Sequence, residues 1–110
     1  MIYPDRVNVI LRERKMVAGT ATFVEVFNGL VPAIVTFMDS NLTFDPSSGG
    51  KLSSRLRIIL KPFSYKIPPN VGTNVTISWK EWTSLQPDGA VELHYFRGRL
   101  HHYEILAKAV

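Results

Sequence analysis

The dominant pattern in this sequence is an alternation of apolar and polar residues with a period of two, which is typical of β-strands with one buried face. Val7, Val9 and Leu11 form one such apolar row. For residues 100–110 a helix is the alternative, because the Ala-Lys-Ala sequence near the end favours helix. The pattern predicts strands over residues 6–14, 20–27, 31–38, 55–61, 74–80, 90–96 and 100–109.

Turn-forming residues separate these segments. An Asn-Gly pair at 28–29 predicts a turn, because both residues tolerate positive φ, and Arg-Gly-Arg at 97–99 predicts a tight turn. Residues 83–89, TSLQPDG, are predicted to form a loop. Pro32 is expected near the start of its strand, where a missing N–H costs least.

The fold class follows from this pattern. No stretch of a dozen residues has helical periodicity, and the sequence contains no repeat and no linker. The 110 residues are therefore predicted to form one all-β domain, residues 1–110. We expect a small β-barrel or sandwich of about seven short strands with one long inserted loop.

The inserted loop is predicted over residues 39–54, where Asp-Pro, Gly-Gly and several serines interrupt the alternation. Connections longer than about 12–15 residues are uncommon in compact domains and are usually functional or disordered. We expect this loop to be extended and mobile. Its large apolar residues are Leu42, Phe44 and Leu52, which either dock on a neighbouring molecule or belong to a simply disordered segment.

Positive charge is concentrated in one part of the sequence. Residues 46–80 contain six basic residues and no acidic one, whereas the rest has seven basic against nine acidic residues. Two interpretations remain open for the basic strand at 55–61: charges that protect an edge strand from aggregation, or a surface along the path of a phosphate backbone. The second interpretation assigns Lys51, Arg55 and Arg57 to a surface that faces DNA.

The composition excludes several classes of protein. A hydrophobic content of 45% argues against disorder, and the absence of cysteine excludes disulfides and thiolate chemistry. No apolar run approaches the roughly 20 residues of a transmembrane helix, and the first residues lack the layout of a signal peptide. We expect an intracellular product with no membrane association.

No catalytic set of residues is evident, so the chain is predicted not to be an enzyme. On a strand, His101 and His102 point to opposite faces and cannot jointly bind one ion. His94 can face one of them across the final hairpin, but no third ligand is obvious. The Ser-Ser-Gly-Gly-Lys sequence at 47–51 lacks the first glycine of a phosphate-binding loop. No metal and no cofactor are predicted.

Four aromatic residues follow the basic strand: Phe63, Tyr65, Trp79 and Trp82. They form either a platform on which bases stack or, more commonly, core and interface anchors. We predict that one tryptophan is a core residue and that the other lies at a contact between subunits.

Three stretches of the chain resemble the head-to-tail connector proteins of long-tailed bacteriophages, of the stopper or head-completion type. RVNVILRERK, residues 6–15, resembles the opening strand. Residues 45–77 resemble the polar loop, strand, Pro-rich turn and strand that follow, and GRLHHYEILAKAV, residues 98–110, resembles the closing strand. The chain departs from the family in SWKEWTSLQPDG, residues 78–89, which corresponds to no part of that pattern.

The resemblance implies a small β-barrel that forms a ring below the portal of a virion. In that family the inserted loop points inward and the ring holds packaged double-stranded DNA until the tail attaches. It implies four kinds of partner: further copies of the chain, portal or adaptor proteins above, a tail terminator or tail tube below, and DNA contacted without sequence specificity. Two alternatives remain, a single-stranded nucleic-acid-binding domain of OB type and a tail terminator or minor tail subunit.

Overall fold

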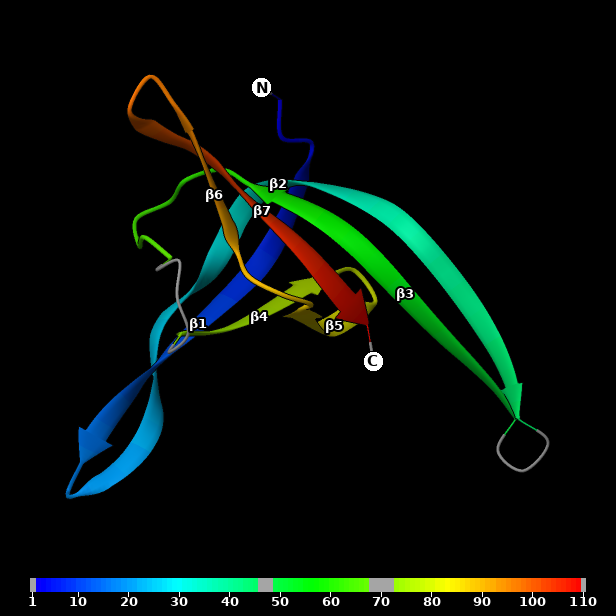
Figure 1. Ribbon diagram of the computed structural model, residues 1–110, viewed down its shortest axis with the longest axis horizontal. Coiled ribbons are helices and arrows are strands. Elements are labelled where there is room, and N and C mark those ends of the chain that lie inside the picture. Colours follow the sequence, from blue (N-terminus) through cyan, green and yellow to red (C-terminus); the bar gives the residue numbers. More distant parts are fainter. Residues whose placement is uncertain (1, 46–48, 68–72, 110) are drawn as a thin grey trace.

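The computed structural model of the protein describes residues 2–45, 49–67 and 73–109, and within 39–54 it describes the backbone alone. The described part is all-β and contains no helix, as the alternation predicts (Figure 1). Its seven strands are β1 (Asp5–Val17), β2 (Thr20–Asp45), β3 (Gly49–Leu60), β4 (Thr73–Trp79), β5 (Trp82–Pro87), β6 (Glu92–Phe96) and β7 (Arg99–Ala109).

The strands form an antiparallel barrel of Greek-key type. β1, β2 and β3 pair in sequence, and β4 then returns to the free side of β1. β5 follows β4 and pairs with the end of β7, while β7 pairs along β3 from Ser54↔Ala109 to Leu60↔Tyr103. This last pairing closes the ring of hydrogen bonds. β6 lies outside that ring and pairs with β7 alone.

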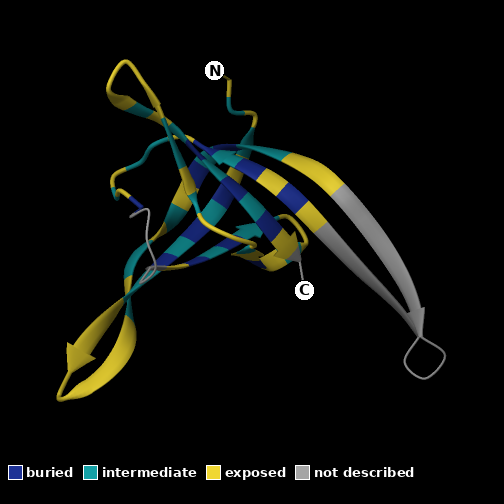
Figure 2. Cartoon of the chain, viewed as in Figure 1, coloured by how far each residue is buried: buried dark blue, intermediate teal, exposed yellow. Residues whose placement is uncertain are grey.

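The core consists of the rows of side chains that point into the barrel. Val7, Val9 and Leu11 of β1 are fully buried, as the alternation predicts (Figure 2). β2, β3, β4 and β7 add residues with the same two-residue spacing, and β5 adds Leu85. The further buried core residues are Val31, Ala33, Leu56, Ile58, Leu60, Ile67, Val75, Ile77, Leu85, Tyr103, Ile105 and Ala107.

Tyr103 connects the strands to the segment that follows β3. Its phenolic oxygen accepts a hydrogen bond from the backbone N–H of Ile67 at 3.0 Å, and both residues are buried. The Phe63 ring lies 4.7 Å from that of Phe27 and 6.0 Å from that of Tyr103, measured between centroids. Burial raises the pKa of the Tyr103 phenol, so this side chain stays neutral and can hold the segment against the core.

Several local predictions were wrong, each because pairing between strands overrides a local preference. Residues 28–29 form no turn, since Asn28 pairs with Ile10 and Gly29 with Val9 inside the β1–β2 ladder. Residues 82–87 form β5 rather than a loop. The strand predicted at 100–109 is confirmed as β7, and the helical alternative for this segment does not hold. The tight turn at 97–99 is confirmed, with positive φ at both Arg97 and Gly98.

Pro32 lies in the middle of β2 instead of near the start of a strand. Its carbonyl oxygen accepts a hydrogen bond from the N–H of Lys61 at 3.0 Å, just beyond the end of β3. In a β-strand the nitrogen and the carbonyl of one residue face the same neighbour. The missing N–H of Pro32 therefore faces Lys61, one position beyond the last pair of the β2–β3 ladder, so only a bond at the end of this ladder is lost.

The predicted loop at 39–54 is also different in the structure. Its backbone continues β2 and β3 as a two-stranded ribbon, paired from Asp39↔Arg55 to Asp45↔Gly49, while residues 46–48 lie outside the described part. Successive hydrogen bonds of the ladder extend the pairing, although the regular alternation of apolar and polar residues is interrupted in this part of the sequence. The mobility of this segment stays a prediction.

Two hairpins extend beyond the barrel and give the molecule its elongated shape (Figure 1). One is the ribbon of β2 and β3, and the other is the outer part of β1 and β2 around the turn at Ala18-Gly19, which we call the first arm (residues 14–23). The radius of gyration is 15.8 Å, whereas a compact chain of this length has about 13 Å. Within the described residues, no helix has the length and apolar character needed to cross a membrane.

We predict that Tyr103→Phe lowers the free energy of unfolding by roughly 1–3 kcal/mol, because the buried N–H of Ile67 loses its acceptor. Urea denaturation measures this change. The matched control is Tyr95→Phe, because Tyr95 is exposed, and it should change the stability by less than about 0.5 kcal/mol. Equal stability of the two variants would show that the hydrogen bond contributes nothing.

Candidate functional site

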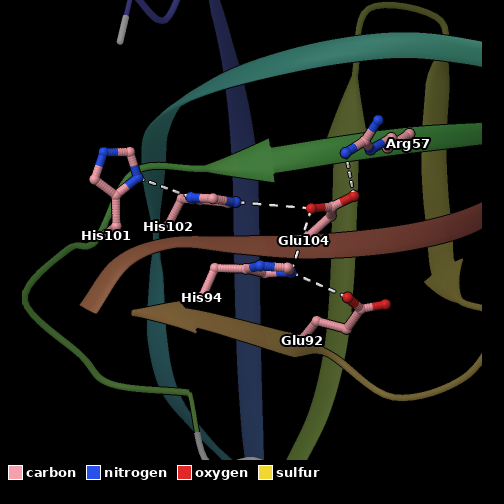
Figure 3. A network of polar contacts seen from close by, with 6 residues as sticks. All are labelled: Arg57, Glu92, His94, His101, His102 and Glu104. Carbon is pink, nitrogen blue, oxygen red and sulfur yellow. Dashed lines mark hydrogen bonds and ion pairs between the residues drawn. The ribbon is translucent and has the colours of Figure 1, made fainter. Parts of the chain in front are cut away.

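The most concentrated group of chemically active side chains lies on the outer wall of the barrel, on β6 and β7. His94 of β6 pairs with His102 of β7, and Glu92 pairs with Glu104. Residues directly opposite each other in an antiparallel pair share a face, so these four side chains point outward together (Figure 3). We call His94, His102 and Glu104 the histidine cluster.

Short distances join the members of the histidine cluster. Glu104 Oε2 lies 3.3 Å from His94 Nε2 and 3.7 Å from His102 Nε2. The two imidazole rings are stacked with centroids 4.6 Å apart, and Glu92 Oε1 lies 3.0 Å from His94 Nε2. His102 and Glu104 are only 15% and 17% exposed, so the inner half of the cluster is partly shielded from water.

Two further residues hold the cluster from outside. Arg57 of β3 forms an ion pair with Oε1 of Glu104, across the β3–β7 pairing that closes the barrel (Figure 3). His101 Nδ1 lies 2.9 Å from His102 Nδ1, so one of these nitrogens donates a hydrogen bond to the other. The second oxygen of Glu104 and the second nitrogen of His102 are thereby turned toward His94.

A β-bulge brings the histidines together. The register passes from Tyr95↔Leu100 to His94↔His102 and leaves His101 without a partner in the ladder. Such an extra residue re-aims the side chains beside it. The expectation that His101 and His102 point to opposite faces is wrong, since their rings are in contact. The bulge is the cause of this contact.

The pKa of His102 is lowered. Desolvation by burial is the largest cause, and the neighbouring His94 and His101 lower the pKa further, whereas Glu104 raises it. A lowered pKa keeps the imidazole neutral near pH 7, and a neutral imidazole offers one nitrogen lone pair. Desolvation therefore favours the form of His102 that has one nitrogen lone pair available for coordination.

Glu104 is the residue that sequence reasoning missed. The sequence showed no third ligand beside the histidines, yet donor atoms of His94, His102 and Glu104 all lie within 4.8 Å of one another. The spacing of His102 and Glu104 by two residues on one strand was the available signal, since it places both on one face. The bulge at His101, which decides that His94 joins this face, leaves no mark in the sequence.

The basic residues expected to face DNA lie close to acidic partners where their side chains are described. Arg57 pairs with Glu104, and Arg55 lies 3.4 Å from Asp88, which also lies 3.9 Å from Lys108. The charges of Arg55 and Arg57 on the barrel wall are therefore locally compensated. The side chain of Lys51 lies outside the described part, and so do those of Leu42, Phe44 and Leu52, although the backbones of Leu42 and Leu52 pair.

Trp79 and Trp82 meet across the tight turn between β4 and β5. They pair directly, and their rings stack with centroids 5.6 Å apart at an interplanar angle of 18°. Phe37 of β2 contacts both rings edge-on, at 6.1 Å and 5.3 Å. We call these three residues the aromatic cluster. Both tryptophans are half-buried and pack against the core, so the structure does not single out one of them as the core residue.

The aromatic cluster leaves apolar surface exposed, since Phe37 and its neighbour Met38 are each about half accessible to solvent. A role of Trp79 and Trp82 at a subunit contact stays a prediction. Phe63 and Tyr65 are also half-buried and pack against the core. This packing favours the anchor interpretation of these two residues over a platform for bases.

The first arm also exposes apolar side chains. Met16 is 69% exposed and Phe23 is 54% exposed. Because Arg14 pairs with Phe23 and Met16 with Ala21, Met16 and Phe23 lie on the same face of the ribbon. Large apolar side chains that gather on one exposed face commonly mark a contact surface.

Comparisons with protein-family models, with curated proteins and with solved structures found no match to this chain.

We predict that Arg57→Glu destabilises the fold by on the order of 1 kcal/mol, because the new carboxylate lies beside Glu104 in a partly exposed setting. The double variant Arg57→Glu/Glu104→Arg should recover part of this loss. Urea unfolding of both single variants and of the double variant gives the coupling energy as a double-mutant cycle. A coupling energy of zero would show that the ion pair does not form in solution.

Proposed function

We propose that this chain is a non-enzymatic structural subunit of the neck of a tailed-bacteriophage virion. It assembles as a homo-oligomeric ring between the portal or adaptor proteins and the tail terminator or tail tube. The resemblance of residues 6–15, 45–77 and 98–110 to stopper-type connectors suggests the family. The observation that carries an assembly role is the pair of hairpins that extend beyond the barrel.

These hairpins have few contacts of their own to stabilise them. In the described residues, the outer part of each hairpin is a ribbon of two strands with no third strand beside it. Two-stranded ribbons are at best marginally stable in water, and their open edges are templates for pairing with another chain. A neighbouring subunit that covers them provides both the missing hydrogen bonds and a place to bury apolar side chains.

A ring supplies such a neighbour to every subunit. Contacts between two different patches of identical chains repeat around an axis and close when the rotation allows it. The exposed face of the first arm, with Met16 and Phe23, is one candidate patch, and the aromatic cluster is a second on another part of the barrel. Two distinct patches are what a head-to-tail interface requires.

The contact with packaged DNA is assigned to Lys51, Arg55 and Arg57 on the inner surface of the ring. The three residues lie on β3, in the order in which this strand passes from the ribbon onto the barrel. Contacts with phosphate position DNA without reading its sequence, which suits the retention of a packaged genome. The ion pairs of Arg55 and Arg57 reduce the charge available there, so we assign a modest electrostatic role to each.

A single-stranded nucleic-acid-binding domain of OB type is the second candidate. The Greek-key barrel favours it, because OB domains are small Greek-key barrels. Such domains bind through exposed aromatic rings and uncompensated positive charge. Phe63 and Tyr65 instead pack against the core, and Arg55 and Arg57 lie near acidic residues, so the ring subunit is the better supported function.

We predict that the chain associates with itself as its concentration rises and that Met16→Ser/Phe23→Ser shifts this equilibrium toward monomer. Both side chains are exposed in the subunit, so the free energy of unfolding should change by less than about 0.5 kcal/mol per substitution. Sedimentation equilibrium of the two proteins measures the shift.

Leu30→Ser is the matched control for the arm variant, because Leu30 is an equally exposed apolar residue that lies outside the first arm. It should associate like the natural sequence. A chain that stays monomeric at every concentration and binds short single-stranded oligonucleotides tightly, with a steep dependence on salt, would contradict the ring and favour the OB-type function.

We predict that Lys51→Gln/Arg55→Gln/Arg57→Gln weakens the retention of DNA in assembled particles. Neutral glutamine avoids the repulsion that a reversed charge would meet at Asp88 and Glu104. The isolated subunit should lose no more than about 1 kcal/mol of stability, since exposed ion pairs contribute little. The encapsidated DNA is measured by nuclease protection.

The control variant is Lys66→Gln/Arg97→Gln/Arg99→Gln. It removes the same amount of positive charge from exposed basic residues that do not lie on β3. Particles that carry this control should keep their DNA. If particles with the β3 variant retain their DNA equally well, Lys51, Arg55 and Arg57 have no role in DNA retention and only protect an exposed strand from aggregation.

A further inference from the structure

We propose that His94, His102 and Glu104 bind one divalent transition-metal ion, of the class of Zn²⁺, on the outer wall of the barrel. Two imidazole nitrogens and one carboxylate oxygen are a ligand set that Zn²⁺ commonly takes in proteins. The inference concerns residues of a single chain, so it is independent of the ring and of the proposed function.

The distances fit a small tetrahedral ion. Zn–N and Zn–O bonds of about 2.0–2.2 Å place neighbouring ligand atoms roughly 3.3–3.5 Å apart. Glu104 Oε2 already lies 3.3 Å from His94 Nε2 and 3.7 Å from His102 Nε2. Two of the three edges of the site are therefore close to their final length before an ion enters.

The third edge, between the imidazoles, requires the rings to turn. The rings are nearly parallel, at 7°, and an ion must lie in the plane of each ring that binds it. The rings must therefore tilt toward each other about their Cβ–Cγ bonds. His94 is 40% exposed and free to make most of this movement, whereas the more buried His102 is held in place by His101.

The atoms that do not face the site are already engaged. Arg57 binds Oε1 of Glu104, which leaves Oε2 for the ion. The proposed site uses the tautomer in which Nδ1–H of His102 donates to His101 Nδ1, 2.9 Å away, because this tautomer leaves the lone pair of His102 on Nε2. Outer partners of this kind fix the tautomer and orientation of metal ligands. Arg57 and His101 are thus positioning residues rather than ligands.

The charge pattern of the hairpin also favours a cation at this place. Glu92 and Glu104 are directly opposite each other in the β6–β7 ladder, and like charges in such a pair are destabilising. Arg57 lies on the far side of Glu104. An ion between the histidines and Glu104 would offset the repulsion, and Glu92 or water can complete the coordination, since Glu92 Oε1 lies 3.0 Å from His94 Nε2.

The test uses protein without a polyhistidine tag and two probes, Co²⁺ and Zn²⁺. We expect the visible absorption of tetrahedral Co²⁺, its displacement by Zn²⁺, and a higher melting temperature with Zn²⁺, because an ion that binds only the folded state stabilises it. Mg²⁺ and Ca²⁺ should have no effect, since these ions prefer oxygen ligands. An equal response to Mg²⁺ and Zn²⁺, or no Co²⁺ absorption at millimolar concentration, would overturn the proposal.

Variants separate the ligands from their neighbours. His94→Gln, His102→Gln and Glu104→Gln should each weaken Zn²⁺ binding by at least about a hundredfold, because loss of an outer partner alone costs about 10–100-fold. Unfolding curves measured without metal establish that each variant is folded. If the folded variants bind Zn²⁺ as tightly as the natural sequence, the ion binds elsewhere and the assignment is wrong.

His101 provides the matched control, because it is a histidine that touches the cluster without being a ligand. His101→Asn keeps an acceptor for His102 Nδ1–H and should bind Zn²⁺ within about threefold of the natural sequence, whereas His101→Ala should lose about tenfold. A loss in His101→Asn as large as in His102→Gln would make His101 a ligand and contradict the geometry proposed for the site.

Discussion

The pairing of β3 with β7 is the interaction on which the rest of the structure depends. It joins the middle of the chain to its end and converts an open sheet into a closed ring of strands. On the inner side, closure brings Ile58 opposite Ile105 and seals the core. On the outer side, it brings Arg57 within reach of Glu104. Closure removes the edges of both strands over this stretch, whereas in the part of the chain that the structure describes the outer edge of β6 and the edges of the two hairpins beyond the barrel stay open.

β7 serves both faces of the barrel because its side chains alternate. Its inward residues, Tyr103, Ile105 and Ala107, are buried, whereas His102 and Glu104 point outward into the histidine cluster. A rigid, buried inner row therefore fixes the positions of the polar outer row. This coupling explains how side chains on an outer wall acquire defined geometry, which surface residues on a free hairpin would lack. A site built on such a strand needs few supporting residues of its own.

The hairpins that support the proposed assembly role have the opposite character. In the first arm, Met16 and Phe23 are exposed apolar side chains that increase the surface that a neighbour can cover. Under the proposed assembly role, contact with a neighbouring subunit would offset the entropic cost of ordering an extended ribbon.

The sequence by itself determined the all-β class, the inward row of Val7, Val9 and Leu11, and the turn at 97–99, since local alternation and turn chemistry depend on neighbouring residues alone. Tertiary pairing decided the rest. Pairing with β1 continues β2 across the Asn-Gly pair, and pairing between β2 and β3 forms a ribbon where a loop was predicted at 39–54, because ladder bonds outweigh local preferences. Tertiary pairing also created the histidine cluster: a regular hairpin with a turn at 97–99 would pair His94 with His101, and the bulge pairs it with His102 beside Glu104. A one-residue shift of register moves a side chain to the other face, and only the folded sheet determines where that shift occurs.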